Sequence, residues 1–465
     1  MMREYKRYEE YQDSGIEWIA DIPKNWIISK IKYLVKEPVS DGPHETPDYV
    51  YDNGVPFLSV DSIQNGKLVF ENCRQISVKD HKIYRNKSNP EKEDILLGKA
   101  ASVGKVAKIN VDFPFSIWSP LALIKPNYKI ESSYLEYSMK SSYFQIQTDL
   151  LSNSNTQKNL GMKDINDILV LKPSIEEQQK IASFLDQKTA EIDEITNKKE
   201  KLIDQLEKYK KSVITDAVTK GKLGDKYLNE DGDLVDEVEM KDSGIEWIRD
   251  VPHFYDISKV KYIADIHGRI GYRGYTKDDL VDKGQGALTL GGKHINDRNQ
   301  LDLSDPTYIS WDKYYESPEI MIEYNNLVVV QRGSIGKVAI IDKNIGEATI
   351  NPSLILVNNL EIKAKYFYYY LISNSVSEFF NLIVSSTAVP MISQEQLDNL
   401  YLPKIDKHSQ NKIINYLDKK TELIDNLIQK TKTSIQKYKE YKKSLIFEAV
   451  TGKIDLRDYE LKGGE

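Results

Sequence analysis

The sequence predicts a mixed α/β protein with two globular regions, related by a pseudo-twofold axis and separated by an antiparallel coiled coil of two long helices. Two observations predict this fold class. The heptapeptide DSGIEWI occurs at 13–19 and again at 242–248, an offset of 242 − 13 = 229 residues. Each half also ends in a long stretch without Pro or Gly, at 174–220 and 404–451, and such stretches favour uninterrupted helices.

The repeat extends beyond the heptapeptide. DSGIEWIADIPKNWIISKIKYL from Asp13 is matched by DSGIEWIRDVPHFYDISKVKYI from Asp242. SVGKVAKI from Ser102 is matched by SIGKVAII from Ser334, an offset of 334 − 102 = 232. At that offset, residues 181–219 and 413–451 share 17 identities in 39 positions. The nearly constant offset indicates a tandem duplication of about half the chain.

Between these anchors the two halves diverge, so each unit has a preserved frame around a variable middle. The β-branched runs DILLGKAASVGKVAKI and NNLVVVQRGSIGKVAII, interrupted by Gly, Asn and Asp, predict strands and turns. SSYLEYSMKSSYFQIQTDL and KAKYFYYYLISNSVSEFFNLI predict helices. Each globular region is therefore expected to be mixed α/β.

The two Pro- and Gly-free stretches predict long helices. Ser174 followed by Glu177 is a capping-box pattern at the start of the first. Apolar residues then recur at alternating three- and four-residue spacing, which is typical of a coiled-coil seam. The seam residues are Leu185, Ile192, Ile195, Leu202, Leu206, Tyr209 and Val213 in the first helix, and Leu417, Ile424, Leu427, Tyr438, Tyr441 and Leu445 in the second.

A helix of roughly 65 Å cannot bury such a stripe within a small domain, so we expect the two helices to pack together. The second globular region follows the first helix after a short polar linker near 221–240, which makes the helices antiparallel and places the globular regions at opposite ends. Each DSGIEWI segment is expected to join a globular region to a helix end, the first near 449–456. The expected domains are 1–174, helix 175–220, linker and second region 221–403, helix 404–452 and tail 453–465.

Composition narrows the class of protein. The chain has 465 residues, and it contains no run of about 18 apolar residues that would span a membrane. The opening segment MMREYKRYEEYQD is too charged for a signal peptide, and the single cysteine, Cys73, fits a reducing cytoplasm. A net charge of −7 disfavours indiscriminate coating of nucleic acid but permits a local basic cleft. No Cys/His cluster has the spacing of a zinc site.

The chain resembles the specificity subunit of type I restriction–modification enzymes over essentially its whole length. The segments that carry the resemblance are WIADIP and WIRDVP, GKAASVGKV and QRGSIGKV, EEQQKIASFLDQKTAEID and NKIINYLDKKTELID, and YKKSVI with YKKSLI. They occur twice, in order, around divergent centres. The second helix departs from the usual Glu-Gln start and has HSQNKI instead.

The resemblance implies that each divergent region is a target-recognition domain that reads one half of a bipartite, asymmetric DNA site. It implies that the helices set the spacing and dock two modification (methyltransferase) subunits and, through them, restriction subunits. S-adenosylmethionine, ATP and Mg²⁺ are then needed by these partners, and no cofactor is expected in this chain. Two alternatives remain open: the recognition subunit of a related system that cuts beside its site, and a coiled-coil protein-interaction adaptor without DNA binding.

We expect no catalysis by the chain itself. Adenine methylation needs an Asn/Asp-Pro-Pro loop, and the nearest segments, NPEK at Asn89 and NPSL at Asn351, lack the second proline. A Walker A loop around GGKH fails, because Ala287 occupies the first glycine position and His294 the hydroxyl position.

Candidate DNA contacts lie in loops that combine glycine with basic or amide side chains, since Arg suits guanine or phosphate and Asn suits adenine. In the second half they are Arg269, Tyr272, Arg273, Lys293, His294, Asn296, Arg298, Gln331, Arg332 and Ser334. In the first half they are His44, Thr46, Gln64, Lys67, Lys99, Ser102, Asn155, Gln157 and Lys158. Each has the competing interpretation of an ordinary polar surface loop. Lys99 and Ser102 occupy a loop matched to that of Gln331, Arg332 and Ser334, and both loops are expected to contact phosphate.

Overall fold

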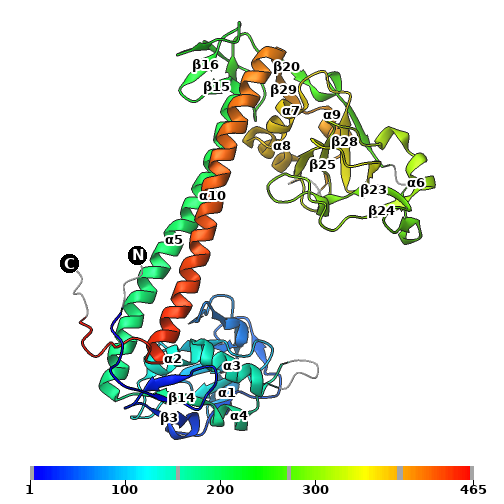
Figure 1. Ribbon diagram of the computed structural model, residues 1–465. Helices are drawn as coiled ribbons and strands as arrows, with labels where there is room; N and C mark the ends of the chain where they lie inside the picture. Colours follow the sequence, from blue (N-terminus) through cyan, green and yellow to red (C-terminus); the bar gives the residue numbers. More distant parts are fainter. Residues whose placement is uncertain (1–4, 153–157, 270–273, 385–390, 461–465) are drawn as a thin grey trace. The chain divides into compact units, whose positions relative to one another are not determined.

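The computed structural model describes residues 5–152, 158–269, 274–384 and 391–460 (Figure 1). The chain divides into two compact units, residues 1–200 with 433–465 and residues 201–432, and each is described by itself. The long helix α5 (Ile175–Lys220) begins in the first unit and ends in the second, and α10 (Lys407–Val450) begins in the second and ends in the first. The prediction of two long helices in a mixed α/β protein is confirmed.

The first unit contains two four-stranded sheets, with strand orders β11-β10-β13-β4 and β12-β6-β9-β5. All strand pairs are antiparallel except β12 with β6. Every residue of β10 and β13 is buried, which explains their continuous apolar sequences ILLG and LALI. The strands are β4 Ser40–Asp41, β5 Tyr49–Val50, β6 Val55–Leu58, β9 Arg74–Ile76, β10 Ile95–Gly98, β11 Val106–Lys108, β12 Ser116–Ile117 and β13 Leu121–Ile124.

Short hairpins and helices surround these sheets and connect them to the long helices. The hairpin β1–β2 and the pair β3–β14 belong to the frame, whereas α2 and α3 form at the segment predicted to be helical. The bounds are β1 Tyr11–Asp13, β2 Asp21–Pro23, β3 Ile27–Lys30, β7 Ile63–Gln64, β8 Lys67–Leu68, β14 Leu169–Lys172, α1 Val78–Tyr84, α2 Ser132–Lys140, α3 Ser142–Leu151, α4 Met162–Asp167, η1 Ile31–Tyr33 and η2 Val60–Ser62.

The second unit repeats this plan, with sheets β21-β28-β25-β26 and β22-β24-β23-β27. Here too one pair, β23 with β27, is parallel and occupies the place of β6 with β12. The strands are β21 Asp265–Gly268, β22 Leu280–Val281, β23 Gly286–Leu290, β24 Tyr308–Ser310, β25 Leu327–Val330, β26 Val338–Ile340, β27 Ala348–Ile350 and β28 Leu354–Asn358. The variable middles therefore share one topology despite their different sequences.

The frame of the second unit also matches that of the first. The hairpin β18–β19 and the pair β20–β29 repeat β1–β2 and β3–β14. The remaining bounds in the second unit are β18 Met240–Asp242, β19 Asp250–Pro252, β20 Asp256–Lys259, β29 Tyr401–Lys404, α6 Trp311–Tyr315, α7 Ala364–Leu371, α8 Asn374–Val384, α9 Gln394–Asp398, η3 Val260–Tyr262, η5 Lys277–Asp279, η6 Gly292–His294 and η7 Pro318–Ile320. The segment after α5, predicted as a short polar linker near 221–240, contains regular secondary structure. Its first part forms a three-stranded antiparallel sheet of β15 Lys222–Leu223, β16 Lys226–Leu228 and β17 Leu234–Val235.

Tyrosines hold each sheet region to the long helices in the same way in both units. Tyr137 on α2 donates a hydrogen bond to Asp186 on α5 at 2.7 Å, and Tyr369 on α7 donates to Asp418 on α10 at 2.6 Å. The offsets are 369 − 137 = 232 and 418 − 186 = 232, so these contacts are duplicates. They explain part of the tyrosine-rich composition, because each ring is buried while its hydroxyl finds a polar partner.

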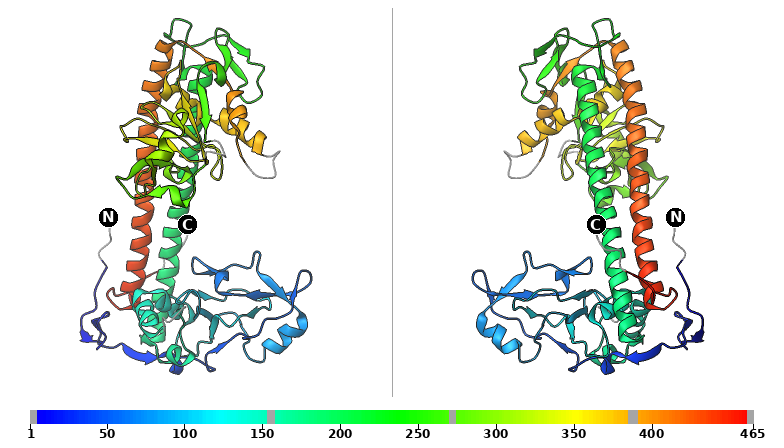
Figure 2. Two further views of the ribbon diagram at one scale, coloured as in Figure 1. Left: turned by 90° about the vertical axis from the view of Figure 1, so that its right-hand side faces the viewer. Right: turned by 90° about the vertical axis from the view of Figure 1, so that its left-hand side faces the viewer.

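The first DSGIEWI segment lies at the C-terminal end of α10, as predicted. Tyr11 of β1 donates to the backbone oxygen of Gly452 at 3.0 Å, and Lys453 donates to the backbone oxygen of Asp21 at 2.5 Å. Gly452 has φ +69°, and a Cβ there would lie 2.3 Å from Pro23, so the junction requires glycine. In Figure 2 the strand-bearing start of the chain (dark blue) lies beside this end of α10.

The coiled-coil seam differs in part from the predicted one. Within each unit α5 and α10 lie side by side and antiparallel (Figures 1 and 2). Buried positions include Leu185, Ile192, Leu417 and Ile424, which were predicted. Others that were predicted are exposed, namely Ile195, Leu202, Tyr209 and Leu427, while Thr189, Thr196, Thr421, Ile428, Thr431 and Ile435 are buried. Thr189 and Thr421 are buried beside the hydroxyl groups of Tyr137 and Tyr369, at 3.1 and 3.5 Å, so part of the burial along the long helices comes from the globular regions and not from the partner helix.

Candidate nucleic-acid interface

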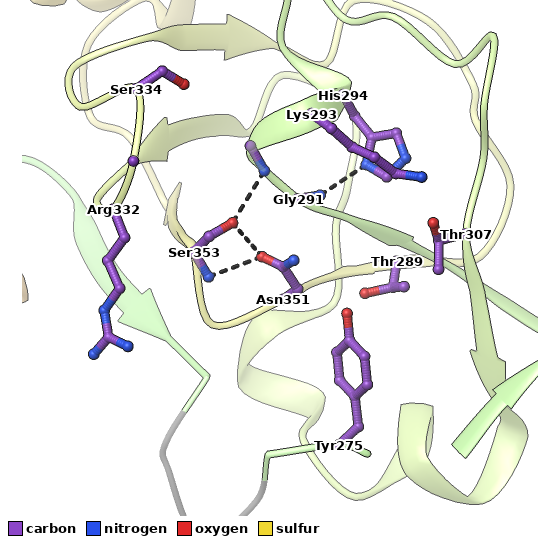
Figure 3. Close-up of a pocket in the computed structure, with 12 residues that line it drawn as sticks. Tyr275, Thr289, Gly291, Lys293, His294, Thr307, Arg332, Ser334, Asn351 and Ser353 are labelled. Carbon is purple, nitrogen blue, oxygen red and sulfur yellow. Dashed lines mark hydrogen bonds between the residues drawn. The ribbon is translucent and has the colours of Figure 1, made fainter. Parts of the chain in front are cut away.

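Each unit has a pocket at the same place in its variable sheet. In the second unit a cavity of about 380 Å³ opens between the end of β23, η6, the 331–334 loop and the 351–353 turn (Figure 3). In the first unit a cavity of about 390 Å³ opens beside β6, η2 and β9. We call these the second-unit pocket and the first-unit pocket.

The lining residues of the two pockets occupy equivalent positions. Phe57, Ser59 and Asp61 line the first-unit pocket, and their counterparts at an offset of 232 (289 − 57, 291 − 59, 293 − 61) line the second-unit pocket. Those counterparts are Thr289, Gly291 and Lys293. The strand register adds a further pair: Trp118 and Asn351 each follow the strand that runs parallel to β6 or β23. The two pockets are therefore duplicates with different side chains.

His294 is a structural part of the second-unit pocket wall. Its Nδ1 accepts a hydrogen bond from the backbone N–H of Gly291 at 2.9 Å, so its Nε2 carries the proton that is donated to the backbone oxygen of Asp305 at 3.0 Å. Burial lowers the pKa of His294, and the side chain is only 2% exposed. The neutral imidazole thereby fixes the turn that presents Lys293.

Lys293, Asn296 and Arg298 lie on the same loop but have different surroundings. Lys293 is exposed and forms an ion pair of 2.6 Å with Asp305. The side-chain oxygen of Asn296 accepts from the backbone N–H groups of Arg298 and Gln300, which closes the loop. Arg298 donates to Gln429 of α10 at 2.7 Å, so this loop also contacts the long helix within its unit.

Arg269 is buried. Its Nε donates to the backbone oxygen of Ile350 at 2.9 Å, its second guanidinium nitrogen donates to Thr349 at 3.1 Å, and the guanidinium lies 5.6 Å from the centroid of the Tyr275 ring. Burial lowers the pKa of Arg269. The side chain thus braces the end of β27 beneath the second-unit pocket. Tyr272 and Arg273, predicted beside it, lie outside the described residues.

The predicted residues of the 331–334 loop divide between wall and rim. Gln331 is buried, and its Nε2 donates to the backbone oxygens of Pro352 and Leu354. Arg332 and Ser334 are exposed at the rim of the second-unit pocket, where the Nε of Arg332 lies 3.1 Å from the sulfur of Met391.

In the first unit a buried carboxylate gathers basic side chains. Asp41 on β4 lies 2.6 Å from Lys87, 3.0 Å from Lys99 and 3.1 Å from His44. Burial by itself raises the pKa of Asp41, but hydrogen bonds from Lys87 and Lys99 outweigh it and the pKa is lowered. The cluster holds two lysines around one carboxylate, so it keeps a net positive charge. The structure thus brings together His44 and Lys99, which were predicted, with Asp41 and Lys87, which were not.

The remaining predicted residues of the first unit lie separately. Thr46, Gln64 and Lys67 are exposed, with Gln64 on the rim of the first-unit pocket, and Ser102 is half-buried. Lys158 is exposed and paired with Asp149 at 2.9 Å. Asn155 and Gln157 lie outside the described residues.

Residues that sequence reasoning missed are mainly pocket walls: Asp61, Glu71, Arg74, Tyr275, Thr289 and Asn351. The signal that could have found Asp61 was the offset of 232 from Lys293, applied to the variable middle and not only to its anchors. Across the described residues, no group of three or more His, Cys, Asp or Glu side chains could hold a metal ion. No helix in the described part of the chain is long and apolar enough to cross a membrane.

The variable sheets, the preserved frame and the long helices can be compared with known proteins. The model of the family described as "Type I restriction modification DNA specificity domain" matches residues 23–205 and 307–437, more than half of the chain. The chain belongs to this family. One match falls on each copy of the duplicated unit. The first match includes the start of α5, and the rest of α5 lies between the two matches.

Curated relatives of this specificity family match about half of the chain. The EcoBI specificity subunit of Escherichia coli is 26% identical over 217 residues, which is 46% of this chain and 45% of that protein. The EcoKI specificity subunit of E. coli strain K12 is 25% identical over 214 residues, with 45% of each protein covered. The matched stretch thus spans less than half the length of these relatives.

Solved structures share the fold over more of the chain. A chain from a study of "complex assembly and conformational transition of the type I R-M system" aligns with a TM-score of 0.67 at 12% identity, covering 93% of this chain and 99% of that one. The HsdS subunit of Thermoanaerobacter tengcongensis aligns with a TM-score of 0.50 at 13% identity, covering 93% and 98%. The specificity-subunit fold is therefore present in this chain.

Proposed function

We propose that the chain is the sequence-specific DNA-recognition subunit of a type I restriction–modification complex. The observation that carries this proposal is that one duplicated scaffold presents two unlike surfaces. Tyr137 and Tyr369 bind the long helices identically, whereas Asp61 and Lys293 stand at matched positions with opposite charge. A protein that held two copies of one ligand would have kept both surfaces alike. Two unlike surfaces on equal frames suit a bipartite, asymmetric DNA site.

Exposed cations of both units supply the general attraction to the DNA backbone. They include Arg332 in the second unit and Lys87 of the Asp41 cluster in the first. Phosphate contacts of this kind release counterions, so binding falls steeply as salt is raised. Buried Arg269, His294 and Gln331 support these loops from inside. We expect two short half-sites separated by about 5–8 unspecified base pairs, because sites read from one face of DNA lie about one helical turn apart.

Two modification subunits are proposed as the protein partners, with restriction subunits joining through them. In the second unit the helix pair leaves large apolar side chains exposed: Leu202 is 40% exposed, Tyr209 48%, Leu423 68% and Leu427 46%. Such side chains on long helices suit docking of another protein's helices. The chain supplies recognition and the partners supply catalysis, with S-adenosylmethionine, ATP and Mg²⁺ bound by them. The cytoplasm, where the DNA is, is the proposed location.

The test is to map methylated adenines across the genome of a strain that carries this chain and its modification partner. A bipartite motif is expected, and exchange of one variable middle for that of another family member should change only one half of it. A motif whose halves both ignore the exchange would exclude the recognition role. Binding of the purified complex to DNA that shows no salt dependence would favour a protein-interaction adaptor instead.

A further inference from the structure

The two matched pockets differ in the sign of their charge. The second-unit pocket is lined by Lys293 and Arg332, and none of its described lining residues carries a carboxylate. The first-unit pocket is lined by Asp61 and Glu71 together with Arg74. Counted over the described lining residues, the formal charge is therefore +2 in the second-unit pocket and −2 + 1 = −1 in the first-unit pocket, with His294 neutral. Two pockets derived by duplication have acquired opposite electrostatics.

The second-unit pocket offers hydrogen-bond donors. Asn351 uses its side-chain oxygen to accept from the backbone N–H and the hydroxyl of Ser353, at 2.8 and 2.5 Å, which turns its NH₂ group toward Gly291 (Figure 3). Thr289 is 1% exposed, and its hydroxyl has no hydrogen-bond partner within the described chain. A buried hydroxyl without a partner is costly, and a ligand that carries an acceptor removes that cost.

Lys293 is free to exchange its partner. Its ion pair with Asp305 involves side chains that are 51% and 83% exposed. Such exposed pairs contribute little to stability, so an acceptor group that enters the pocket can replace Asp305 as the partner of the ammonium group. The second-unit pocket therefore combines a movable cation with fixed neutral donors.

The first-unit pocket offers acceptors. The guanidinium of Arg74 is already engaged, because it donates to the hydroxyl of Tyr49 at 2.9 Å and lies 4.9 Å from the centroid of that ring. The carboxylates of Asp61 and Glu71 are exposed, and neither forms an ion pair with another described residue. Ionised carboxylates accept hydrogen bonds and do not donate them. A ligand group with N–H donors fits this pocket.

We propose that these matched pockets are the positions at which the two halves of the chain choose different bases. The second-unit pocket binds the acceptor edge of guanine, O6 and N7, through Lys293 and the donors around it. The first-unit pocket binds an exocyclic amino group, that of cytosine or adenine, through Asp61 and Glu71. This inference rests on the proposed DNA-recognition function. A phosphate ligand is disfavoured, because the carboxylates of the first-unit pocket repel phosphate. The DNA backbone is negatively charged at every position, so two pockets that both bound phosphate would both be positively charged.

The test uses the full-length chain with its modification partner, and compares Lys293→Gln and Asp61→Asn with the exposed-site controls Lys283→Gln and Asp52→Asn. Methylated motifs are mapped for each, and thermal unfolding is measured to show that the variants fold. Lys293→Gln should relax a guanine position in one half of the motif by about 10- to 100-fold in discrimination. Asp61→Asn should relax a cytosine or adenine position in the other half, and both controls should leave the motif unchanged.

The outcomes separate this inference from the function on which it rests. If the wild-type complex gives no bipartite motif, the proposed function fails and the inference fails with it. If the wild type gives a motif and both pocket variants keep it, with weaker binding and a shallower salt dependence for Lys293→Gln, the pockets do not read bases. Loss of specificity in the wrong half, or at a base of the wrong class, also overturns the assignment.

Cys73 supplies an independent readout. It is the single cysteine of the chain, it lines the first-unit pocket, and burial raises the pKa of its thiol. A duplex with the complete motif should slow the reaction of Cys73 with N-ethylmaleimide by at least about fivefold, because a filled pocket blocks access to the thiol. A duplex in which only the first-unit half-site is scrambled should protect less. Equal rates with both duplexes contradict occupancy of the first-unit pocket.

Discussion

Lys442 on α10 donates two hydrogen bonds to the carboxylate of Asp193 on α5, at 2.7 and 2.8 Å. Lys210 on α5 binds Asp425 on α10 in the same manner, at 2.8 and 2.7 Å. The offsets are 442 − 210 = 232 and 425 − 193 = 232, so one ion pair has been copied into both units. Since each pair takes one residue from each helix, each unit specifies the antiparallel register by itself.

Removal of one of these pairs should destabilise the helix pair slightly. The side chains of Lys442 and Asp193 are 28% and 44% exposed, so water and salt screen their attraction. We expect Lys442→Met to lower the free energy of unfolding by about 0.5 kcal/mol. Urea unfolding of Lys442→Met, Asp193→Asn and the double variant should give a positive coupling energy that shrinks at 1 M salt. The matched control is Lys437→Met, an exposed position on the same helix. A coupling energy of zero would mean that the register depends on apolar packing alone.

The N-terminal segment should hold the end of α10. Tyr8, 6% exposed, donates a hydrogen bond to Glu177, a side chain that is 4% exposed, and Ile16 and Ile19 share a core with Ala449 and Leu456. We therefore expect deletion of residues 1–19 to speed hydrogen exchange across 445–451 markedly. Unchanged protection of that stretch would exclude the junction role of this segment.

A single hydroxyl tests the same junction more finely. Tyr8→Phe leaves the buried carboxylate of Glu177 without one of its partners, which should cost about 1–3 kcal/mol. Tyr51→Phe is the control, because Tyr51 is 99% exposed. Thermal unfolding and exchange at 445–451 should respond to the first substitution and not to the second.

The Asp41 cluster predicts a stability that depends on pH. Asp41→Asn removes the charge that Lys99, 8% exposed, is paired with, and should cost about 3 kcal/mol at pH 7. The pKa of Asp41 is lowered in the folded protein, so its contribution is complete above the unfolded value of about 3.9 and is lost as pH falls through the folded pKa. The difference between wild type and variant, measured by urea unfolding, should therefore narrow below about pH 4. A difference that stays constant down to pH 2.5 would mean that shape, and not charge, holds the cluster.

Exposed apolar residues on the second unit's helices predict a partner surface. Leu202→Glu should change the free energy of unfolding of the chain by less than about 0.5 kcal/mol, because Leu202 is 40% exposed. It should nevertheless weaken capture of the modification subunit by at least about tenfold, since a charge in an apolar contact remains unpaired. Pull-down titration measures this, with Lys208→Glu, an exposed neighbour on α5, as the control. Equal capture by both variants would place the partner elsewhere on the chain.

The sequence by itself determined the duplicated plan. The repeated heptapeptide, the offset of 232 and the Gly- and Pro-free stretches predicted two equal frames and two long helices, because repeats and helical periodicity are local properties of a chain. Resemblance of the motifs predicted the family. The sequence also predicted that the first DSGIEWI lies at the C-terminal end of α10. The second copy follows the C-terminal end of α5, and the pseudo-twofold symmetry places the first copy at the equivalent end of α10.

Only the tertiary structure decided which polar residues face outward. Arg269, His294 and Gln331 are of residue types that commonly contact DNA, yet they are buried and bind backbone groups. The matched pockets were also hidden: Asp61 and Lys293 belong to segments with no visible similarity, and the offset of 232 pairs the two residues without showing that each lines a pocket. Burial and pocket shape depend on contacts between residues far apart in the chain, and no local pattern encodes them.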